Sequence, residues 1–241
     1  MGVSTKIKSP SGDASQKRKP EIRPAFRTGP RQRRGNPKSE IVIGVLAVQG
    51  AVEKHILMLE RCGVRSIRVR FAEELDAVHG LVIPGGESTT VGKLMARYGL
   101  DKKIIERARA GMPILGTCTG MILLAKKIAG SEQHRLGLMD LTVLRNAFGR
   151  QVDSFEADLD VDVIGPPPFR GVFIRAPYAV DVNRKVEVLA RYGDKIVLLR
   201  EGNLLACAFH PELTDDTRIH EYFIGMVRRS VPTKRSSNPR D

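Results

Sequence analysis

The chain has 241 residues, of which 41% are hydrophobic, and its 40 Lys and Arg against 27 Asp and Glu give a formal net charge of +13. The length suffices for one domain with a buried core and does not require two. The basic excess lies at the two ends: residues 1–40 hold 11 Lys or Arg against 3 Asp or Glu, residues 228–241 hold 5 against 1, and the stretch between them has a net charge of +1. A near-neutral central stretch argues against a basic nucleic-acid-binding domain.

The N-terminal segment also lacks the hydrophobic pattern of a folded domain. Residues 1–40 are rich in Lys, Arg, Pro, Ser and Gly and show almost no apolar periodicity. Such a segment cannot bury enough surface to offset the entropy of ordering it. We therefore expect a disordered basic extension over 1–40, one domain over 41–227, and a flexible basic tail over 228–241.

The predicted elements alternate between strand and helix at first and become strand-rich later. Apolar runs predict strands over 41–48, 66–71, 80–84 and 112–115. Helical spacing predicts helices over 52–62, 72–78, 87–98 and 101–110, and one more in the apolar run 121–130. The later strands are expected over 141–144, 154–163, 171–174, 186–192, 196–200 and 204–209, before a closing helix over 215–227. This order predicts an α/β fold in three layers, with a mostly parallel sheet flanked by helices.

The cysteine content and the hydropathy bear on the compartment. The chain has three cysteines, too few for a disulfide framework and without a Cys-x-x-Cys pair of the metal-binding kind. No apolar run approaches the length of a membrane span, and no secretory signal or lipid anchor is apparent. We expect a cytoplasmic protein with no membrane partner, no metal and no organic cofactor.

A first candidate catalytic motif is Gly116-Thr117-Cys118-Thr119-Gly120, which lies between an apolar run and a predicted helix. This is the cysteine version of a nucleophile elbow, in which the reactive side chain sits on a strained turn between strand and helix. The N–H groups at the start of the helix favour a thiolate. A free cysteine in a loop can also simply be buried in the core. The motif alone leaves both interpretations open.

A second motif, His210-Pro211-Glu212, follows the last apolar run and favours the catalytic interpretation. A cysteine nucleophile needs a base, and the base needs a third group that fixes its tautomer. In an extended segment residues i and i+2 project to the same side, so the Glu212 carboxylate is expected to reach His210. Together the two motifs predict a triad of Cys118, His210 and Glu212.

These motifs, together with the segment 84–90 (Pro-Gly-Gly-Glu-Ser-Thr-Thr), resemble the class I, or triad, glutamine amidotransferases. The finer resemblance is to the branch formed by the glutaminase subunits of pyridoxal 5'-phosphate synthase. It rests also on segments 46–52, 145–156 and 173–177, and it covers about residues 41–227. Family members start near what is here Ile41, so the segment 1–40 is either a basic tail or an artefact of an upstream start codon.

The resemblance implies a flavodoxin-like fold and a set of site residues. It assigns the oxyanion hole to backbone N–H groups of Gly86 and Thr119, where family members commonly carry Ala in place of Thr119. It assigns the glutamine pocket to six residues, Gly86, Glu87, Ser88, Arg145, Ile174 and Arg175. Without the Cys118 motif, the two glycines at 85 and 86 would indicate only a turn.

The resemblance also implies an activity and a partner. The expected reaction is hydrolysis of L-glutamine to L-glutamate and ammonia through a cysteine thioester. The ammonia would pass to a barrel-shaped synthase subunit, in a hetero-oligomer, for pyridoxal 5'-phosphate (vitamin B6) biosynthesis. One alternative is the glutaminase of histidine biosynthesis, which has a similar triad but lacks the run 145–156. An alternative of another class is a nucleic-acid-binding module, which only the total charge favours.

Overall fold

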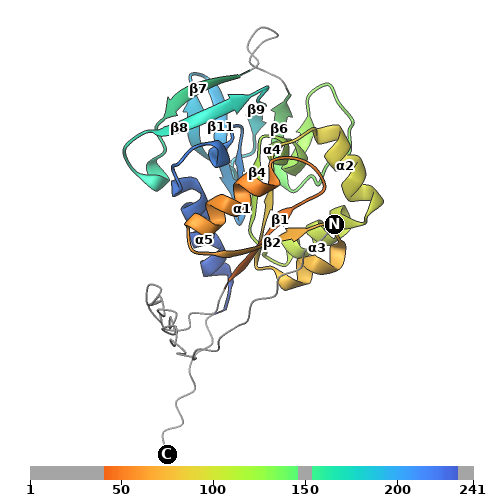
Figure 1. Ribbon diagram of the computed structural model, residues 1–241. Coiled ribbons are helices and arrows are strands. Elements are labelled where there is room, and N and C mark those ends of the chain that lie inside the picture. The colour runs from red at the N-terminus through yellow and green to blue at the C-terminus, as the bar shows by residue number, and fades with distance from the viewer. Residues whose placement is uncertain (1–40, 146–153, 233–241) are drawn as a thin grey trace, which may run out of the picture. The chain divides into compact units, whose positions relative to one another are not determined.

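The computed structural model describes residues 41–145 and 154–232, which form an α/β domain around one large sheet (Figure 1). The predicted extension over 1–40 and the end of the chain from 233 lie outside the described residues. So do residues 146–153, which make up most of the motif run 145–156. The strands of the large sheet follow the order β2-β1-β3-β4-β12-β11-β9-β6-β5, with β10 paired to β11. Within the described residues, no helix is long and apolar enough to cross a lipid bilayer.

One half of the sheet is parallel and carries the most apolar strands. It consists of β2 (Arg65–Val69), β1 (Val42–Leu46), β3 (Gly80–Ile83), β4 (Ile114–Thr117) and β12 (Leu204–Cys207). Every residue of β3, β4 and β12 is buried, as expected for strands that are covered on both faces. The carboxyl ends of these parallel strands meet at one edge, where ligands gather in such sheets.

The other half of the sheet is largely antiparallel. It consists of β11 (Lys195–Glu201), β9 (Tyr178–Val182), β6 (Met139–Leu144), β5 (Ala125–Ile128) and the side strand β10 (Glu187–Tyr192). A separate two-stranded sheet pairs β7 (Ser154–Leu159) with β8 (Phe169–Ile174). Phe155 of β7 stacks on Phe173 of β8, and both rings contact Tyr192 of β10, which joins the small sheet to the large one.

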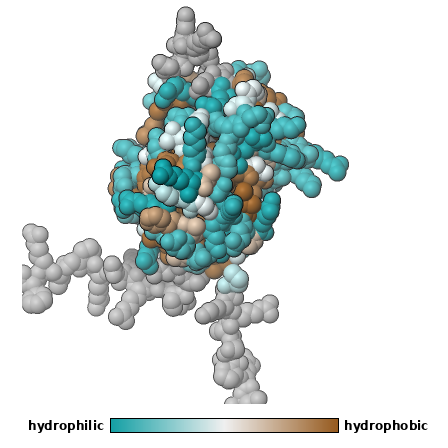
Figure 2. All heavy atoms as spheres, turned by 90° about the vertical axis from the view of Figure 1, so that its right-hand side faces the viewer, coloured by the Kyte–Doolittle hydropathy of each residue, from teal (hydrophilic) through white to brown (hydrophobic). Residues whose placement is uncertain are grey.

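Helices flank the sheet. α1 (Val52–Arg61) and α5 (Arg218–Ser230) lie side by side, and α2 (Ser88–Arg97) packs with α3 (Leu100–Arg109) (Figure 1). Figure 2 shows the molecule from the right-hand side of Figure 1. On this face, hydrophobic residues are scattered among a majority of hydrophilic ones. Helices with a polar outer face and an apolar inner face are expected to cover a sheet in this way. The prediction of an α/β fold with a mostly parallel central sheet flanked by helices is confirmed.

The helix expected over 121–130 was wrong in its second half. α4 (Thr119–Leu124) ends after six residues, and the chain continues as β5, which pairs with β6. The carbonyls of Leu123 and Leu124 accept hydrogen bonds from the N–H groups of Leu136 and Leu138, at 2.7 and 2.9 Å. These bonds satisfy the last carbonyls of the helix from outside it, so the helix ends there.

Three further expectations needed correction. β9 was not predicted at all, because its five residues, Tyr-Ala-Val-Asp-Val, are too few to show a clear alternation. The strand expected over 154–163 ends at Leu159 and gives way to a 3-10 turn over Asp162–Ile164. The closing helix begins at Arg218 rather than 215, and it continues to Ser230, three residues into the segment expected to be a flexible tail.

Candidate active site

Cys118 lies at the carboxyl end of β4, directly before α4, with only 7% of its surface exposed. Its backbone has φ 49° and ψ −98°, a conformation that non-glycine residues rarely adopt. The flanking glycines make this turn possible because a Cβ at Gly120 would collide with the Ile83 carbonyl, and one at Gly116 would collide with Gly120. The structure therefore contains the strained elbow that the sequence predicted, with Cys118 at its apex.

His210 reaches the same place from the neighbouring strand, since β12 runs parallel to β4 and pairs Cys207 with Thr117. Its Nδ1 lies 2.7 Å from Oε1 of Glu212. The expected contact is therefore present, but the expected extended backbone is not. Pro211–Leu213 is a 3-10 turn, since Pro at the first position fixes φ near its helical value. This turn, rather than the side-chain alternation of an extended strand, brings the Glu212 carboxylate to the Nδ1 of His210.

The electrostatics favour a charged His210. Burial lowers the pKa of His210, but hydrogen bonds to Cys118 and Glu212 outweigh burial and raise that pKa to about 10. Burial likewise raises the pKa of Glu212, while His55 and His210 more than offset it, so the net pKa is lowered. At neutral pH the carboxylate thus faces an imidazolium. A charged His210 can give a proton to the leaving group of a reaction at the neighbouring Cys118.

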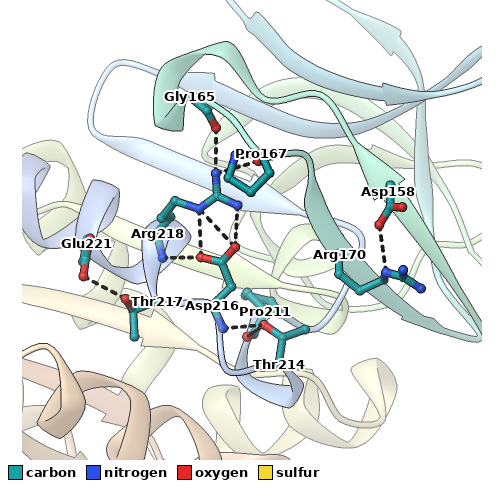
Figure 3. Close-up of polar contacts among 10 residues, drawn as sticks. All are labelled: Asp158, Gly165, Pro167, Arg170, Pro211, Thr214, Asp216, Thr217, Arg218 and Glu221. Carbon is teal, nitrogen blue, oxygen red and sulfur yellow. Dashed lines mark hydrogen bonds and ion pairs between the residues drawn. The ribbon is translucent and has the colours of Figure 1, made fainter.

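Arg218 holds in place the segment that follows Glu212 in the chain (Figure 3). Its guanidinium forks onto the carboxylate of Asp216, and Nη1 also donates to the carbonyls of Gly165 and Pro167, at 2.6 and 2.7 Å. The backbone N–H of Arg218 donates to the same Asp216 carboxylate at 3.0 Å. One side chain thus joins the start of α5, the segment after η3 (Pro211–Leu213) and the 165–167 turn. Forked contacts of this kind fix both distance and orientation.

Replacing Arg218 with Ala is expected to lower the free energy of unfolding by about 2 to 4 kcal/mol, because hydrogen bonds that involve a charged group contribute about 1.5 to 3 kcal/mol. Arg170, which is also labelled in Figure 3, is the matched control: its side chain is 55% exposed and pairs with Glu156 and Asp158. Arg170→Ala is expected to cost less than about 1 kcal/mol. Urea unfolding of both variants checks this, and equal losses would contradict the role given to Arg218.

A cavity of about 420 Å³ opens above Cys118, in the size range of small-molecule sites. Nine of the ten residues that the sequence singled out line it, namely Gly86, Glu87, Ser88, Cys118, Thr119, Arg145, Ile174, Arg175 and His210. Glu212 is the tenth, and it lies behind the His210 imidazole. Arg175 has φ 41°, so the two non-glycine described residues with positive φ, Cys118 and Arg175, both line the cavity. Such strain is concentrated at functional sites in proteins.

The loop at Gly85 and Gly86 packs against the His210 ring and is held by two hydrogen bonds to its carbonyls. A Cβ at Gly85 would collide with the His210 ring, so this glycine lets the imidazole lie against the loop. The Gly85 carbonyl accepts the N–H of Ala51 at 3.1 Å, and the Gly86 carbonyl accepts the hydroxyl of Thr119. The Gly86–Glu87 peptide thus directs a carbonyl, and not an N–H, toward the Thr119 side chain.

Glu87 and Arg145 lie together at the rim of the cavity. Glu87 caps α2 by accepting the N–H groups of Thr89 and Thr90, at 3.1 and 2.6 Å. The hydrogen bond from Thr90 is the main cause that lowers the pKa of Glu87, to about 2, so the carboxylate is charged at neutral pH. Arg145 Nη2 lies 3.9 Å from Oε1 of Glu87. Opposite charges at one rim can bind the two charged ends of an α-amino acid.

Several residues of the site were missed by the sequence analysis. Gln49 Oε1 accepts the N–H of Glu87 at 2.8 Å, and Gln49 lines the cavity with Gly50, Ala51 and Ile122. Gln133 Oε1 accepts hydrogen bonds from Ser88, Thr89 and Arg145, so it holds Arg145 in place. The segment 46–52 carried part of the resemblance, which was a usable signal for Gln49. No signal in the sequence pointed to Gln133, which is 12 residues before Arg145.

The described residues also bear on whether the chain has the ligand set of a metal site. Over residues 41–145 and 154–232, no group of three or more His, Cys, Asp or Glu is arranged to hold a metal ion. All three cysteines are free.

Comparisons with known proteins show the family of the chain. The SNO glutamine amidotransferase family model matches residues 45–229. A relative from Pelotomaculum thermopropionicum named pyridoxal 5'-phosphate synthase subunit PdxT is 59% identical over 182 residues, which are 76% of this chain and 93% of the relative. A relative of the same name from Thermotoga maritima is 50% identical over 77% of this chain and 99% of its own length.

Solved structures give the same result at the level of the fold. A crystal structure described as a glutamine amidotransferase is 50% identical, with a TM-score of 0.74 over 77% of this chain and 98% of that one. The structure of PurLQS from Thermotoga maritima is 19% identical with a TM-score of 0.60 over 77% of this chain and 98% of that one, which supports the fold alone. On the match over 45–229 and these identities, the chain belongs to the SNO glutamine amidotransferase family.

Proposed function

We propose that this chain is the glutaminase subunit of a pyridoxal 5'-phosphate synthase and hydrolyses L-glutamine to L-glutamate and ammonia. The observation that carries the proposal is the cavity in which Cys118 and His210 meet the predicted glutamine-binding residues, which come from segments far apart in the chain. The membership of the SNO family and the names of the relatives support the same activity.

In the acylation step the Cys118 sulfur attacks the side-chain amide carbon of glutamine. A carbon–sulfur bond forms, and the electron pair of the carbonyl moves to oxygen, where the N–H groups assigned to Gly86 and Thr119 stabilise it. Collapse of this intermediate breaks the carbon–nitrogen bond. His210 gives its proton to the departing nitrogen, so ammonia leaves and a thioester remains. Glu212 keeps the imidazole oriented throughout through its 2.7 Å bond to Nδ1.

In the second step water hydrolyses the thioester. Neutral His210 takes a proton from the water as it attacks the thioester carbon, and the carbon–sulfur bond then breaks. Glutamate leaves, and the sulfur and the imidazolium are restored. The atoms balance as glutamine plus water to glutamate plus ammonia, and no metal or redox partner is needed.

Recognition of glutamine is assigned to the rim of the cavity. Arg145 and Arg175 suit the α-carboxylate because a guanidinium can bond both of its oxygens at once. The charged Glu87 carboxylate suits the α-ammonium group, and Ser88 and the Ile174 backbone complete the pocket. The Ile174 carbonyl lies 3.9 Å from the Cys118 sulfur, so this part of the rim is directly beside the reacting bond.

The partner in this proposal is a barrel-shaped synthase subunit, with which the chain forms a hetero-oligomer that receives the ammonia. Ammonia released to water at neutral pH is protonated and lost as a nucleophile, which makes direct delivery useful. We place the reaction in the cytoplasm, consistent with three cysteines that are all free.

The test is to measure ammonia and glutamate release from L-glutamine by the purified chain with a pyridoxal 5'-phosphate synthase subunit of a relative. We expect equal amounts of the two products and synthesis of pyridoxal 5'-phosphate that depends on glutamine. A parallel assay uses the synthase subunit of histidine biosynthesis. Activity only with the latter partner, or none with either, would contradict the proposal.

A further inference from the structure

A chain of buried polar groups continues behind the triad. Glu212 is 3% exposed, and its Oε1 is taken by His210. Its other oxygen, Oε2, lies 3.3 Å from Nε2 of His55 on α1. His55 Nδ1 in turn lies 3.1 Å from Nε2 of His220 on α5. Both of these histidines are 0% exposed, so a catalytic carboxylate is joined to two imidazoles that water does not reach.

The hydrogen-bonding capacities of these groups allow one consistent assignment. Burial lowers the pKa of His55 and is the main cause that lowers the pKa of His220 to about 3, so both rings are neutral and each carries one N–H. Glu212 Oε2 can only accept and lies 3.3 Å from His55 Nε2, so the His55 proton belongs on Nε2. The hydrogen bond of that nitrogen goes to the Thr117 hydroxyl, and Oε2 itself makes none in the described residues. The Nδ1 of His55 is then a lone pair, which accepts the Nε2–H of His220. His220 Nδ1, which has no partner in the described residues, is left as an acceptor, and a buried orphan acceptor is less costly than an orphan donor.

A neighbouring hydroxyl fits this assignment. Thr117 Oγ1 lies 3.2 Å from the same His55 Nε2. Because a hydroxyl both donates and accepts, Thr117 can accept the hydrogen bond of the His55 Nε2–H and leave the tautomer unchanged. Thr117 belongs to β4, which feeds the Cys118 elbow. His55 Nε2 is thus hydrogen-bonded to the strand of the nucleophile and lies beside the carboxylate of the triad.

The simpler interpretation is that His55 and His220 are core residues that satisfy one another. A mutually satisfied pair would not need the catalytic carboxylate, and apolar side chains would fill the interface of α1 and α5 as well. The observed pair instead brings the nitrogen of its one remaining N–H to within 3.3 Å of Glu212 Oε2. Glu212 Oε2 makes no hydrogen bond in the described residues, so without the nearby N–H dipole of His55 this buried charged oxygen would lose electrostatic support, and the carboxylate could rotate or take up a proton.

We propose that His55, with its tautomer fixed by His220, is a positioning residue that holds the Glu212 carboxylate in the orientation from which it fixes His210. The inference rests on the glutaminase function proposed above and extends its machinery to α1 and α5. His55 touches neither substrate nor the reacting sulfur and acts only through Glu212. It explains why two histidines lie buried between helices that are otherwise packed by apolar residues.

The test compares two variants of His55 with a control on the same helix. His55→Leu keeps most of the volume and removes the donor, whereas His55→Gln retains an N–H near the position of Nε2. Met58→Ala is the control, because Met58 is a buried residue of α1 whose sulfur is bonded to Arg61 and which has no N–H to offer Glu212. Activity is measured with the synthase subunit present, at a temperature at which all variants are folded by circular dichroism.

We expect His55→Leu to lower kcat about 10-fold to 100-fold with little change in KM, a loss of the size seen when the outer partner of a metal ligand is removed. His55→Gln should recover most of kcat, and Met58→Ala should lower the melting temperature without lowering kcat. His220→Leu added to His55→Leu should cost little more, because both act on one chain of bonds. Unchanged kcat in His55→Leu, or equal losses in His55→Leu and His55→Gln, would overturn the proposal.

A second readout does not depend on turnover. In full-length protein labelled with 15N at histidine, His55 and His220 should each show one protonated and one unprotonated nitrogen, with His55 protonated at Nε2. The Nδ1 proton of His210 should shift in His55→Leu and stay in place in Met58→Ala. His55 protonated at Nδ1 would overturn the proposal even in an active enzyme. An inactive wild-type chain with the expected tautomers would overturn the proposed function and leave the bond assignment standing.

Discussion

Replacing Cys118 with Ala is expected to reduce glutamine hydrolysis by a factor on the order of 10⁶, the size of loss seen when the nucleophile of a hydrolytic triad is removed. The two hydroxyls that line the cavity are already bonded, that of Thr119 to the Gly86 carbonyl and that of Ser88 to Gln133, so neither is expected to replace the sulfur. Alanine keeps the Cβ and leaves the strained backbone at φ 49° unchanged. The fold should therefore persist, and the melting temperature should stay within a few degrees of the wild-type value.

The decisive control supplies ammonia from outside. With an ammonium salt in place of glutamine, the synthase subunit should form pyridoxal 5'-phosphate equally well with the wild-type chain or with Cys118→Ala. Normal synthesis from ammonium but none from glutamine would assign the loss to chemistry. Residual glutaminase within 100-fold of wild type would refute Cys118 as the nucleophile, and loss of the ammonium-driven reaction would show damage to the assembly.

The sequence was most informative where chemistry constrains a short segment. Gly116 and Gly120 flank Cys118 because any Cβ would strike neighbouring backbone, so the elbow leaves a local signature. The parallel strands β1, β3 and β4 were likewise predicted, because buried strands are continuous apolar runs. The sequence analysis thus identified the elements that place the site, with boundaries that differ by a few residues.

The parts that escaped prediction depend on contacts between distant segments. β5 forms because β6 pairs with it, and α4 ends because Leu136 and Leu138 satisfy its carbonyls. β9 lies between two strands that precede and follow it along the chain, β6 and β11. No local pattern encodes such pairings, because tertiary context overrides propensity in short elements.

The buried histidines illustrate the same limit within the site. His55 and His220 are 165 residues apart in the chain and meet only when α1 and α5 pack together. In the sequence each is a lone histidine without a motif, for which a structural role is the default expectation. Gln133 is similar, since only the folded chain shows that its amide oxygen gathers Ser88, Thr89 and Arg145.

The structure gives a physical reason to expect that the chain on its own is a poor glutaminase. An oxyanion hole needs N–H groups directed at the developing charge. The Gly86 N–H belongs to the Gly85–Gly86 peptide, whose carbonyl accepts the N–H of Ala51. In the next peptide the Gly86 carbonyl faces Thr119 and the Glu87 N–H is used by Gln49, so these bonds fix the loop in the free chain. Peptides next to glycine can reorient at low cost, because the missing Cβ removes the steric barrier. A bound synthase subunit could thus select an orientation that completes the hole, as a shift between two populations.

We therefore expect the synthase subunit to raise glutaminase kcat about 100-fold to 1,000-fold, the usual effect of one oxyanion donor. The measurement is steady-state ammonia release at saturating glutamine with increasing synthase subunit, and Cys118→Ala supplies the background rate. KM should change less than kcat, because the oxyanion forms only in the transition state and its donor adds little to binding of the substrate. A flat response, with full activity from the isolated chain, would reject partner-dependent completion of the oxyanion hole and leave the triad intact. An increase in affinity without an increase in kcat would place the effect of the partner on the glutamine rim at Glu87 and Arg145 instead.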